Sequence, residues 1–212
     1  LFLDLKVKKA GTYRISCTKN GRTAYWDYQI MDRQQTGARE SFSSKDLIYL
    51  IMSDRFVDGD EGNNDTPDTR EKSDKKNVHG RFGGDIEGIL QQLDHIQELG
   101  ATAIWPTPLL GDDEAEWSYH GYACSDYYHI DPRYGTNEMY RELVQKMHDR
   151  GLKMIMDMVP NHCGAAHWWM KDLPYKNWIN WFDDFTNTCN AFSTNYDINA
   201  SQYDRQLSNR GW

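Results

Sequence analysis

Apolar and polar residues alternate along the first thirty positions of the chain, and this pattern predicts antiparallel β-strands. The alternating segments are 1–7, 12–17 and 25–30. Between the last two, Asn20-Gly21 is typical of the tight turn of a β-hairpin. Because three strands leave one face of a sheet uncovered, we expect residues 1–36 to be the C-terminal strands of an N-terminal antiparallel β-sandwich domain. Residues 37–45 are polar and are predicted to be a linker.

From residue 46 the pattern changes to nearly continuous apolar runs separated by segments of helical periodicity. Three runs are predicted to be strands buried on both faces, namely 46–52, 101–105 and 152–159. Two segments place apolar residues three and four positions apart and predict helices, namely 86–99 and 137–150. Strands that alternate with helices predict a parallel sheet with right-handed crossovers.

The predicted connections differ in length at the two ends of the sheet. The loops after the strands have about 30 residues, whereas each helix returns to the next strand within one or two. This asymmetry is typical of a (β/α)8 barrel, whose functional residues lie on the loops that follow the strands. The alternative is a doubly wound sheet, but no strand is followed by a glycine-rich phosphate turn. We therefore predict an α/β fold in which residues 46–162 form about three of eight barrel strands.

Composition and charge exclude several classes of function. Asp and Glu total 32 against 24 Lys and Arg, which gives a net charge of −8 and argues against a nucleic-acid partner. No apolar run approaches the roughly 18 residues of a membrane span. The four cysteines, Cys17, Cys124, Cys163 and Cys189, have no spacing typical of zinc or redox sites, and no disulfide can be assigned. The chain opens on Leu1, so we expect it to be an interior piece of a longer protein.

The loop after the first predicted strand contains a cluster of oxygen donors. Asp58, Asp60, Asn63 and Asn64 lie within seven residues, and calcium binds about six to eight such oxygens. An EF-hand is excluded, because its sixth and twelfth positions require Gly and Glu. The Gly83 carbonyl and the Asp85 carboxylate at the start of the first helix would add two ligands. The alternatives are a solvated acidic turn and a helix N-cap formed by Asp85.

Two further loops place aromatic and imidazole side chains after neighbouring predicted strands. The first contains Tyr119-His120-Gly121-Tyr122, and the second contains Asp157-Met158-Val159-Pro160-Asn161-His162. In a barrel, the C-terminal ends of neighbouring strands converge on one pocket. Aromatics make up 13% of the chain, a composition that suits sugar stacking but also large cores and interfaces.

The second of these segments resembles the first signature region of glycoside hydrolase family 13, the α-amylase family. Tyr119 to Tyr122, with the Asp131-Pro132-Arg133-Tyr134-Gly135-Thr136 segment, resembles the part of that family between the second strand and helix. The oxygen-rich loop with Gly83-Gly84-Asp85 is similar to the calcium site of cyclodextrin glucanotransferases and of the cyclomaltodextrinase and neopullulanase subgroup. The segment from His167 to Pro174 resembles Bacteroidetes-type neopullulanases.

The resemblance implies a role for each matched residue. Tyr122 would stack on the sugar at the cleavage subsite, His162 would hydrogen-bond its primary hydroxyl, and His120 would line the neighbouring subsite. Asp157 and Asn161 would hold the signature region in shape. Calcium would be the cofactor, held by Asp58, Asp60, Asn63, Asn64, Gly83 and Asp85. Residues 163–212, which show no clear periodicity, would begin the domain inserted after the third barrel strand.

The resemblance also shows what this segment lacks. Retaining glycosidases use a nucleophile and an acid/base carboxyl group, and in this family they come from later strands. No Asp or Glu of this chain matches them. The implied activity of the parent protein is therefore retaining hydrolysis of α-1,4-glucosidic bonds in pullulan, cyclodextrins or starch oligosaccharides, and the chain alone is expected to be inactive.

Two other functions remain open from the sequence. One is a transglycosylase of the same family, and the other is a non-catalytic glucan-binding protein. The implied partner is an α-glucan, and a homodimer of the parent protein is a further expectation. Export, for instance to the periplasm, is the expected location, with the cytoplasm as the alternative.

Overall fold

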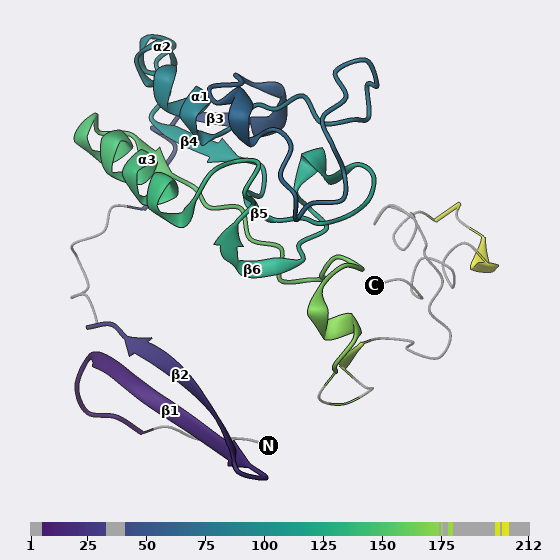
Figure 1. Cartoon of the computed structure of the whole chain (residues 1–212). Helices are drawn as coiled ribbons and strands as arrows, with labels where there is room; N and C mark the ends of the chain where they lie inside the picture. Colours follow the sequence, from purple (N-terminus) through teal and green to yellow (C-terminus); the bar gives the residue numbers. More distant parts are fainter. Residues whose placement is uncertain are drawn as a thin grey trace. The chain divides into compact units, whose positions relative to one another are not determined.

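The computed structural model describes residues 6–32, 41–173, 175, 178–179, 198–199 and 201–203, and the chain divides into two compact units, residues 1–45 and 46–212 (Figure 1). In the smaller unit, β1 (Gly11–Lys19) pairs antiparallel with β2 (Arg22–Ile30). Asn20 and Gly21 adopt φ values of 51° and 76°, as in the tight turns that hairpins favour. The predicted hairpin is confirmed.

The remaining part of the first prediction is not settled by this hairpin. Of the expected strand 1–7, residues 1–5 lie outside the described residues, and Lys6 and Val7 are in no strand. One face of the hairpin is apolar, because Ile15 pairs with Trp26 and Tyr13 with Tyr28. Trp26 is 61% exposed. The assignment of residues 1–36 to a β-sandwich stays a prediction.

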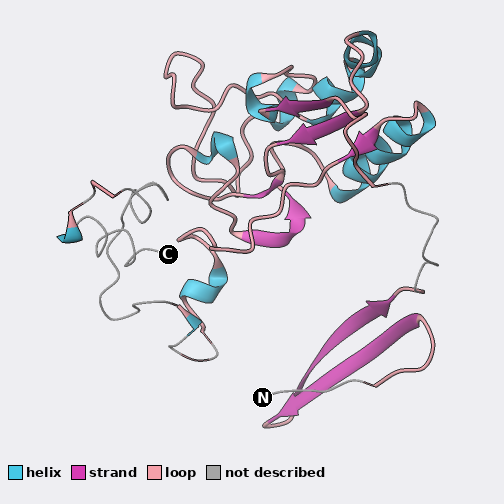
Figure 2. Cartoon of the chain, turned by 180° about the vertical axis from the view of Figure 1, so that it is seen from behind, coloured by secondary structure: helices cyan, strands magenta, loops and turns pink. Residues whose placement is uncertain are grey.

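The larger unit is built on a parallel three-stranded sheet in the order β3-β4-β7. Its strands are β3 (Ile48–Ile51), β4 (Ala103–Pro106) and β7 (Lys153–Met154). Helices α1 (Ile86–Gln91) and α2 (Leu93–Glu98) connect the first two strands, and α3 (Asn137–Asp149) connects the last two (Figure 2). The predicted alternation of strands and helices in a parallel sheet is confirmed.

Three details differ from the expected pattern. The helix predicted over 86–99 is divided at Gln92, whose amide donates to the carbonyl of Ile89 at 3.1 Å in a tighter turn. The third predicted strand is short, because only Lys153 and Met154 form a ladder with β4. The second long loop contains its own antiparallel pair, β5 (Leu110–Gly111) and β6 (Asp126–Ile130). The β5-β6 pair forms where local apolar periodicity gives no signal.

In the described part of the larger unit, four named 3-10 turns lie in the loops, and two of them carry candidate site residues, Asn63 in η2 and His120 in η3. They are η1 (Ser53–Arg55), η2 (Glu61–Asn63), η3 (Ser118–His120) and η4 (Trp168–Met170). Each belongs to a loop that follows a strand of the parallel sheet. The loops are therefore folded segments with hydrogen-bonded turns.

The core lies between the sheet and the helices. The apolar stripe of α1 and α2 is fully buried, with Ile86, Ile89 and Ile96 at 0% exposure. It meets Leu143 and Met147 of α3, which are also at 0%. The three- and four-residue spacing of these side chains is thus explained by burial of one helix face.

The first turn of α3 depends on a side-chain cap. The hydroxyl of Thr136 accepts a hydrogen bond from the amide of Met139 at 3.1 Å. Thr136→Ala is therefore expected to lower the free energy of unfolding by about 1 kcal/mol, measured by urea unfolding. Thr136→Ser keeps the acceptor and serves as the control. An equal loss in both variants would contradict a capping role.

Candidate active site

The C-terminal ends of two parallel strands deliver side chains to one point in front of the sheet. Trp105 lies in β4, and Asp157 follows β7 by three residues. The Asp157 Oδ2 atom accepts a hydrogen bond from Trp105 Nε1 at 2.9 Å and a second from the Tyr122 hydroxyl at 3.1 Å. The carboxylate therefore links both strands to the loop that carries Tyr122.

Two histidines hold the backbone of Tyr122. Its amide donates to His120 Nδ1 at 2.9 Å, and its carbonyl oxygen lies 3.0 Å from His162 Nε2. The side-chain Nδ2 atom of Asn161 lies 3.3 Å from His162 Nδ1. The structure thus brings together all five residues that the sequence predicted for this site: His120, Tyr122, Asp157, Asn161 and His162.

The hydrogen bonds and burial define the protonation of the site. Burial lowers the pKa of His120, and His162 acts in the same direction, while Glu71 opposes both. His120 is therefore neutral at pH 7 with Nδ1 as an acceptor, which leaves the proton on Nε2. Burial and the bond to Asp157 raise the pKa of Tyr122, so its hydroxyl stays protonated and donates.

The two histidines differ in what they can offer to a ligand. The Nε2 atom of His162 faces the carbonyl of Tyr122, and its Nδ1 atom faces Asn161. In this structure both ring nitrogens of His162 are engaged within the protein. Nδ1 of His120 accepts from the Tyr122 amide, which leaves its Nε2–H as the donor of this ring, and Tyr122 is 38% exposed.

A glycine between these residues is required by the backbone. Gly121 has a φ of +77°, and a Cβ atom there would lie 2.1 Å from the carbonyl oxygen of Pro108. Any larger residue would push the loop away from Pro108. The His120-Gly121-Tyr122 sequence is thus a turn that is pressed against the preceding loop.

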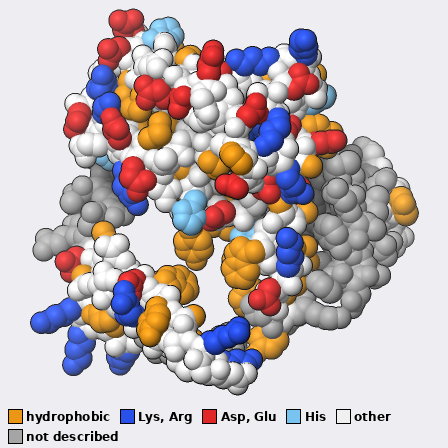
Figure 3. Space-filling model, viewed as in Figure 1, with side chains coloured by type: hydrophobic (Ala, Val, Ile, Leu, Met, Phe, Trp, Pro, Cys, Tyr) orange, Lys and Arg blue, Asp and Glu red, His pale blue; other side chains and the backbone are white. Residues whose placement is uncertain are grey.

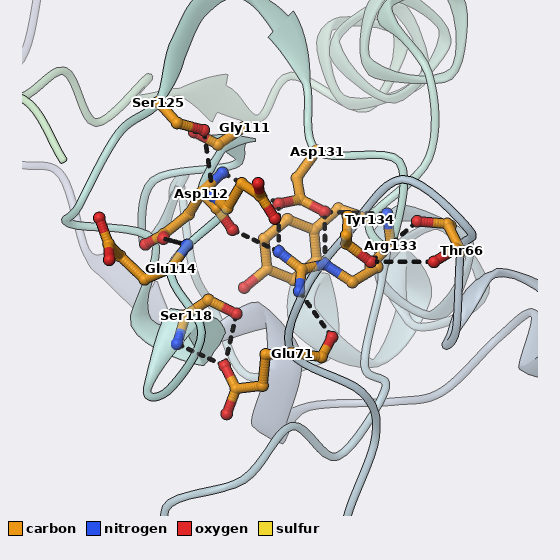
Figure 4. Close-up of polar contacts among 12 residues, drawn as sticks. Thr66, Glu71, Gly111, Asp112, Glu114, Ser118, Ser125, Asp131, Arg133 and Tyr134 are labelled. Carbon is orange, nitrogen blue, oxygen red and sulfur yellow. Dashed lines mark hydrogen bonds and ion pairs between the residues drawn. The ribbon is translucent and has the colours of Figure 1, made fainter. Parts of the chain in front are cut away.

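Behind the site lies a buried ionic network, drawn in Figure 4. The Arg133 guanidinium contacts Asp131 at 2.7 Å, and both side chains are 1% exposed. The same guanidinium donates to the carbonyl oxygens of Glu71, at 3.1 Å, and Asp112. Burial acts to raise the pKa of Asp131, but the hydrogen bonds and charge of Arg133 outweigh it and hold that pKa below its usual value.

Glu71 connects this network to the turn that carries His120. Its carboxylate accepts hydrogen bonds from the Ser118 amide and hydroxyl, both at 2.6 Å, and from the Trp117 amide at 3.1 Å. These bonds fix the start of η3, which ends at His120. Sequence reasoning did not identify Glu71, because a single Glu in a polar loop carries no signal for burial.

The oxygen-rich loop folds around Asp85. One carboxylate oxygen of Asp85 accepts from the amides of Gly59 and Gly88, and the other accepts from the Asp60 amide and the Asn63 side chain, over distances of 2.7–3.1 Å. Asp85 is the N-cap of α1, as one of the two interpretations from sequence expected. These four hydrogen bonds hold the loop around the Asp85 carboxylate.

Three other oxygens of this loop are buried without a hydrogen-bond partner among the described residues. They are the Oδ1 atoms of Asp58, Asn63 and Asn64. Buried acceptors are normally paired, and three of them in one loop match the donor set of a hard cation. Among the described residues, no group of three or more His, Cys, Asp or Glu side chains is arranged to hold a metal ion, so a site here would depend on the two Asn oxygens.

The surroundings of these oxygens also fit a cation. Gly83 has a φ of +92°, and a Cβ there would lie 2.2 Å from Asn64 Oδ1, so only glycine leaves this oxygen in place. Asp60 Oδ1 accepts from the Gly62 amide at 2.9 Å. Lys75 Nζ contacts Asp58 Oδ2 at 2.9 Å and balances part of the negative charge. The predicted residues are therefore gathered here, with Asp58, Asn63 and Asn64 best placed as ligands.

The surface of the larger unit mixes both signs of charge. Acidic and basic side chains intermingle over the face that Figure 3 shows. Among the described residues, no helix is long and apolar enough to cross a membrane.

Comparison with known proteins decides the family. A model of the α-amylase catalytic domain matches residues 50–208 of the chain. The chain belongs to the α-amylase family. The predicted resemblance to glycoside hydrolase family 13 is confirmed, and so is the barrel fold class, of which the parallel sheet is a part.

Relatives of this α-amylase-family chain come from the expected subgroup. The cyclomaltodextrinase of Thermoanaerobacter pseudethanolicus is 32% identical over 182 residues, which cover 82% of this chain and 31% of the relative. Neopullulanase 2 of Thermoactinomyces vulgaris is 32% identical over 193 residues, 87% of this chain and 32% of the relative. An Anoxybacillus α-amylase crystal structure has a TM-score of 0.57 at 33% identity, covering 79% of this chain and 32% of that one. The chain thus spans about a third of the length of these relatives. The Bacteroidetes likeness stays a prediction.

Asp112 gives this α-amylase-family site a predictable response to pH. Burial raises the pKa of Asp112 to about 7, with Asp131 adding to the shift against the bonds from the Glu114 and Ala123 amides. An unfolded carboxyl titrates near pH 4, so between about pH 4 and 7 the folded state binds more protons. The free energy of unfolding should therefore fall as the pH rises through this window.

Asp112→Asn should remove that contribution, and the melting temperature of the variant should vary less between about pH 5 and 7 than that of the wild type. Asp113→Asn changes a more exposed neighbour and is the matched control. Parallel profiles for wild type and Asp112→Asn would show that Asp112 does not titrate in this window.

Proposed function

We propose that the parent protein is a retaining hydrolase of α-1,4-glucosidic bonds in pullulan, cyclodextrins or starch oligosaccharides. One observation carries the proposal, namely the convergence of Tyr122, His120 and Asp157 at the C-terminal ends of β4 and β7. In an α-amylase-family chain, this is the edge of the barrel where substrates bind. Relatives named cyclomaltodextrinase and neopullulanase support the substrate class.

The geometry suggests how this segment would act on a sugar. The Tyr122 ring offers an apolar face for a pyranose, since its hydroxyl is held by Asp157 and its backbone by two histidines. His120 would donate its Nε2–H to a sugar hydroxyl. The role predicted for His162, a hydrogen bond to the primary hydroxyl, would require one of its present contacts to be exchanged for the sugar.

Bond cleavage needs two carboxyl groups that flank the scissile bond. The proposal assigns them to other strands of the parent barrel. This segment would bind and orient the sugar, which lowers the barrier by holding the reacting groups in a productive pose.

Two alternatives give different products. A transglycosylase would transfer the glucosyl group to another sugar, so chromatography would show products longer than the substrate. A non-catalytic glucan-binding protein would retain maltooligosaccharides without releasing reducing ends. A homodimer is a further proposal, and size-exclusion chromatography with light scattering would test it. The compartment, exported or cytoplasmic, stays a prediction that cell fractionation would test.

Tyr122→Ala in the parent protein is expected to lower kcat/KM on maltooligosaccharides by about 10²-fold or more, because the sugar loses the surface that orients it. Release of reducing ends measures this effect. Tyr128→Ala is the matched control, since Tyr128 is 70% exposed on β6. Equal activity of Tyr122→Ala and wild type would refute the assigned role.

We further propose that the loop binds one calcium ion. The buried Oδ1 atoms of Asp58, Asn63 and Asn64 support this proposal, together with the close approach of Gly83 to Asn64. Asp60 and Asp85 would contribute as predicted, although Asp85 already accepts four hydrogen bonds. The ion would tie the loop after β3 to the start of α1, and its role would be structural.

Removal of calcium should lower the melting temperature of the wild-type protein. With free calcium at about 100 times Kd, binding adds about 2.7 kcal/mol to the free energy of unfolding, and a chelator removes this term. Asp58→Asn should melt at nearly the same temperature with calcium and with chelator. Asp68→Asn changes an exposed carboxylate in the same loop and should keep the wild-type response. An unchanged wild-type melting temperature in chelator would argue against the site.

A further inference from the structure

Trp117 combines two features that rarely occur together. Its side chain is 57% exposed, and its backbone has φ 65° and ψ 15°. Among the described residues, Asn20 is the only other residue besides glycine with a positive φ. Asn adopts this conformation readily in turns, whereas a bulky side chain adopts it at a cost in conformational strain.

A buried carboxylate maintains this conformation. Glu71 accepts hydrogen bonds from the amides of Trp117 and Ser118, and from the Ser118 hydroxyl. Arg133 in turn donates to the Glu71 carbonyl oxygen at 3.1 Å, and its guanidinium is 1% exposed. Figure 4 shows this chain of contacts from Arg133 through Glu71 to Ser118. Hydrogen bonds in the protein interior therefore fix the backbone of Trp117.

The indole ring gains little from packing in return. Among the described residues, the indole ring approaches the His79 ring edge-on, with 6.4 Å between the two ring centroids, and His79 is itself exposed. A strained residue that contributes little to the core is unfavourable for stability alone. Strain of this kind concentrates at ligand-binding positions, where the surrounding structure enforces it.

The place of Trp117 in the chain identifies the ligand chemistry. It is the residue before η3, and η3 ends at His120. Glu71 acts on both Trp117 and His120, because it accepts a hydrogen bond from the Trp117 amide and its charge acts to raise the pKa of His120. A flat apolar ring with a polar edge, held rigidly beside a sugar-binding turn, suits the apolar face of a pyranose.

We propose that Trp117 is an additional stacking platform, which binds a glucose unit of an α-glucan at a distance from the unit on Tyr122. This inference rests on the proposed function, because it takes the α-glucan as the substrate. It requires that Trp117 matter for long substrates and not for short ones. Glu71 is then a positioning residue, which acts through the backbone of Trp117.

The deciding variant is Trp117→Gly in the parent protein. Glycine adopts the positive φ without strain, so the melting temperature should stay the same or rise. The KM for maltohexaose should increase about tenfold, while kcat and the KM for maltotriose stay unchanged. Trp117→Phe keeps a flat ring and should restore most of the affinity for maltohexaose. Asn20→Gly makes the same backbone change in the hairpin and should leave all kinetic constants unchanged.

The outcomes separate this inference from the proposed function. A fall in the melting temperature of Trp117→Gly, or an unchanged KM for maltohexaose, would overturn the platform. If the wild type cleaves no glucan, the proposed function fails, and calorimetry with maltohexaose then decides the platform alone. A weaker Kd in Trp117→Gly would support it, and equal affinities, or no binding to the wild type, would overturn it.

Discussion

The buried charge of Arg133 is the constraint on which the loop structure depends. Its guanidinium is 1% exposed and pairs with Asp131, and it also donates to the carbonyl oxygens of Glu71 and Asp112. These partners come from two different loops, so the ion pair joins segments that have no secondary structure in common. Loss of one partner from a buried pair is costly, because the other charge stays buried and uncompensated. The loops are thus held by a polar interior, whereas the helices below them are held by an apolar one.

A second buried pair extends this polar layer toward the first strand. Asp54 and Arg81 are each 1% exposed and lie 3.7 Å apart. Asp54 also accepts the amides of Phe82 and Gly83, and Arg81 donates to the Ser118 carbonyl oxygen. The oxygen-rich loop and the turn with His120 are therefore connected through side chains in the protein interior. A displacement of one loop would therefore alter the buried contacts of the other.

Sequence patterns were sufficient for the elements whose stability is local or apolar. The stripe that includes Ile86 and Ile96 predicted the helical segment, and Asn20-Gly21 predicted the hairpin turn. The division of that helix at Gln92 had no glycine or proline to signal it. The oxygen cluster was visible because its residues are neighbours in the chain. Glu71 was not, because its partners lie 46 and 47 residues away, and nothing local indicates that a loop glutamate is buried.

The network also explains why neither Asp112 nor Asp157 is suited to be the catalytic acid. A raised pKa in a carboxyl group is often a sign of acid catalysis, and Asp112 has one near neutrality. However, Asp112 is 1% exposed, and its two oxygens accept the amides of Glu114 and Ala123. Asp157 is more accessible, but its Oδ2 atom is occupied by Trp105 and Tyr122. Both carboxylates hold the loops of the candidate site, whereas a retaining mechanism requires a pair of carboxyl groups about 5 Å apart across the bond. The hydrogen bonds of these two carboxylates therefore fit a structural role and not the role of the reacting pair.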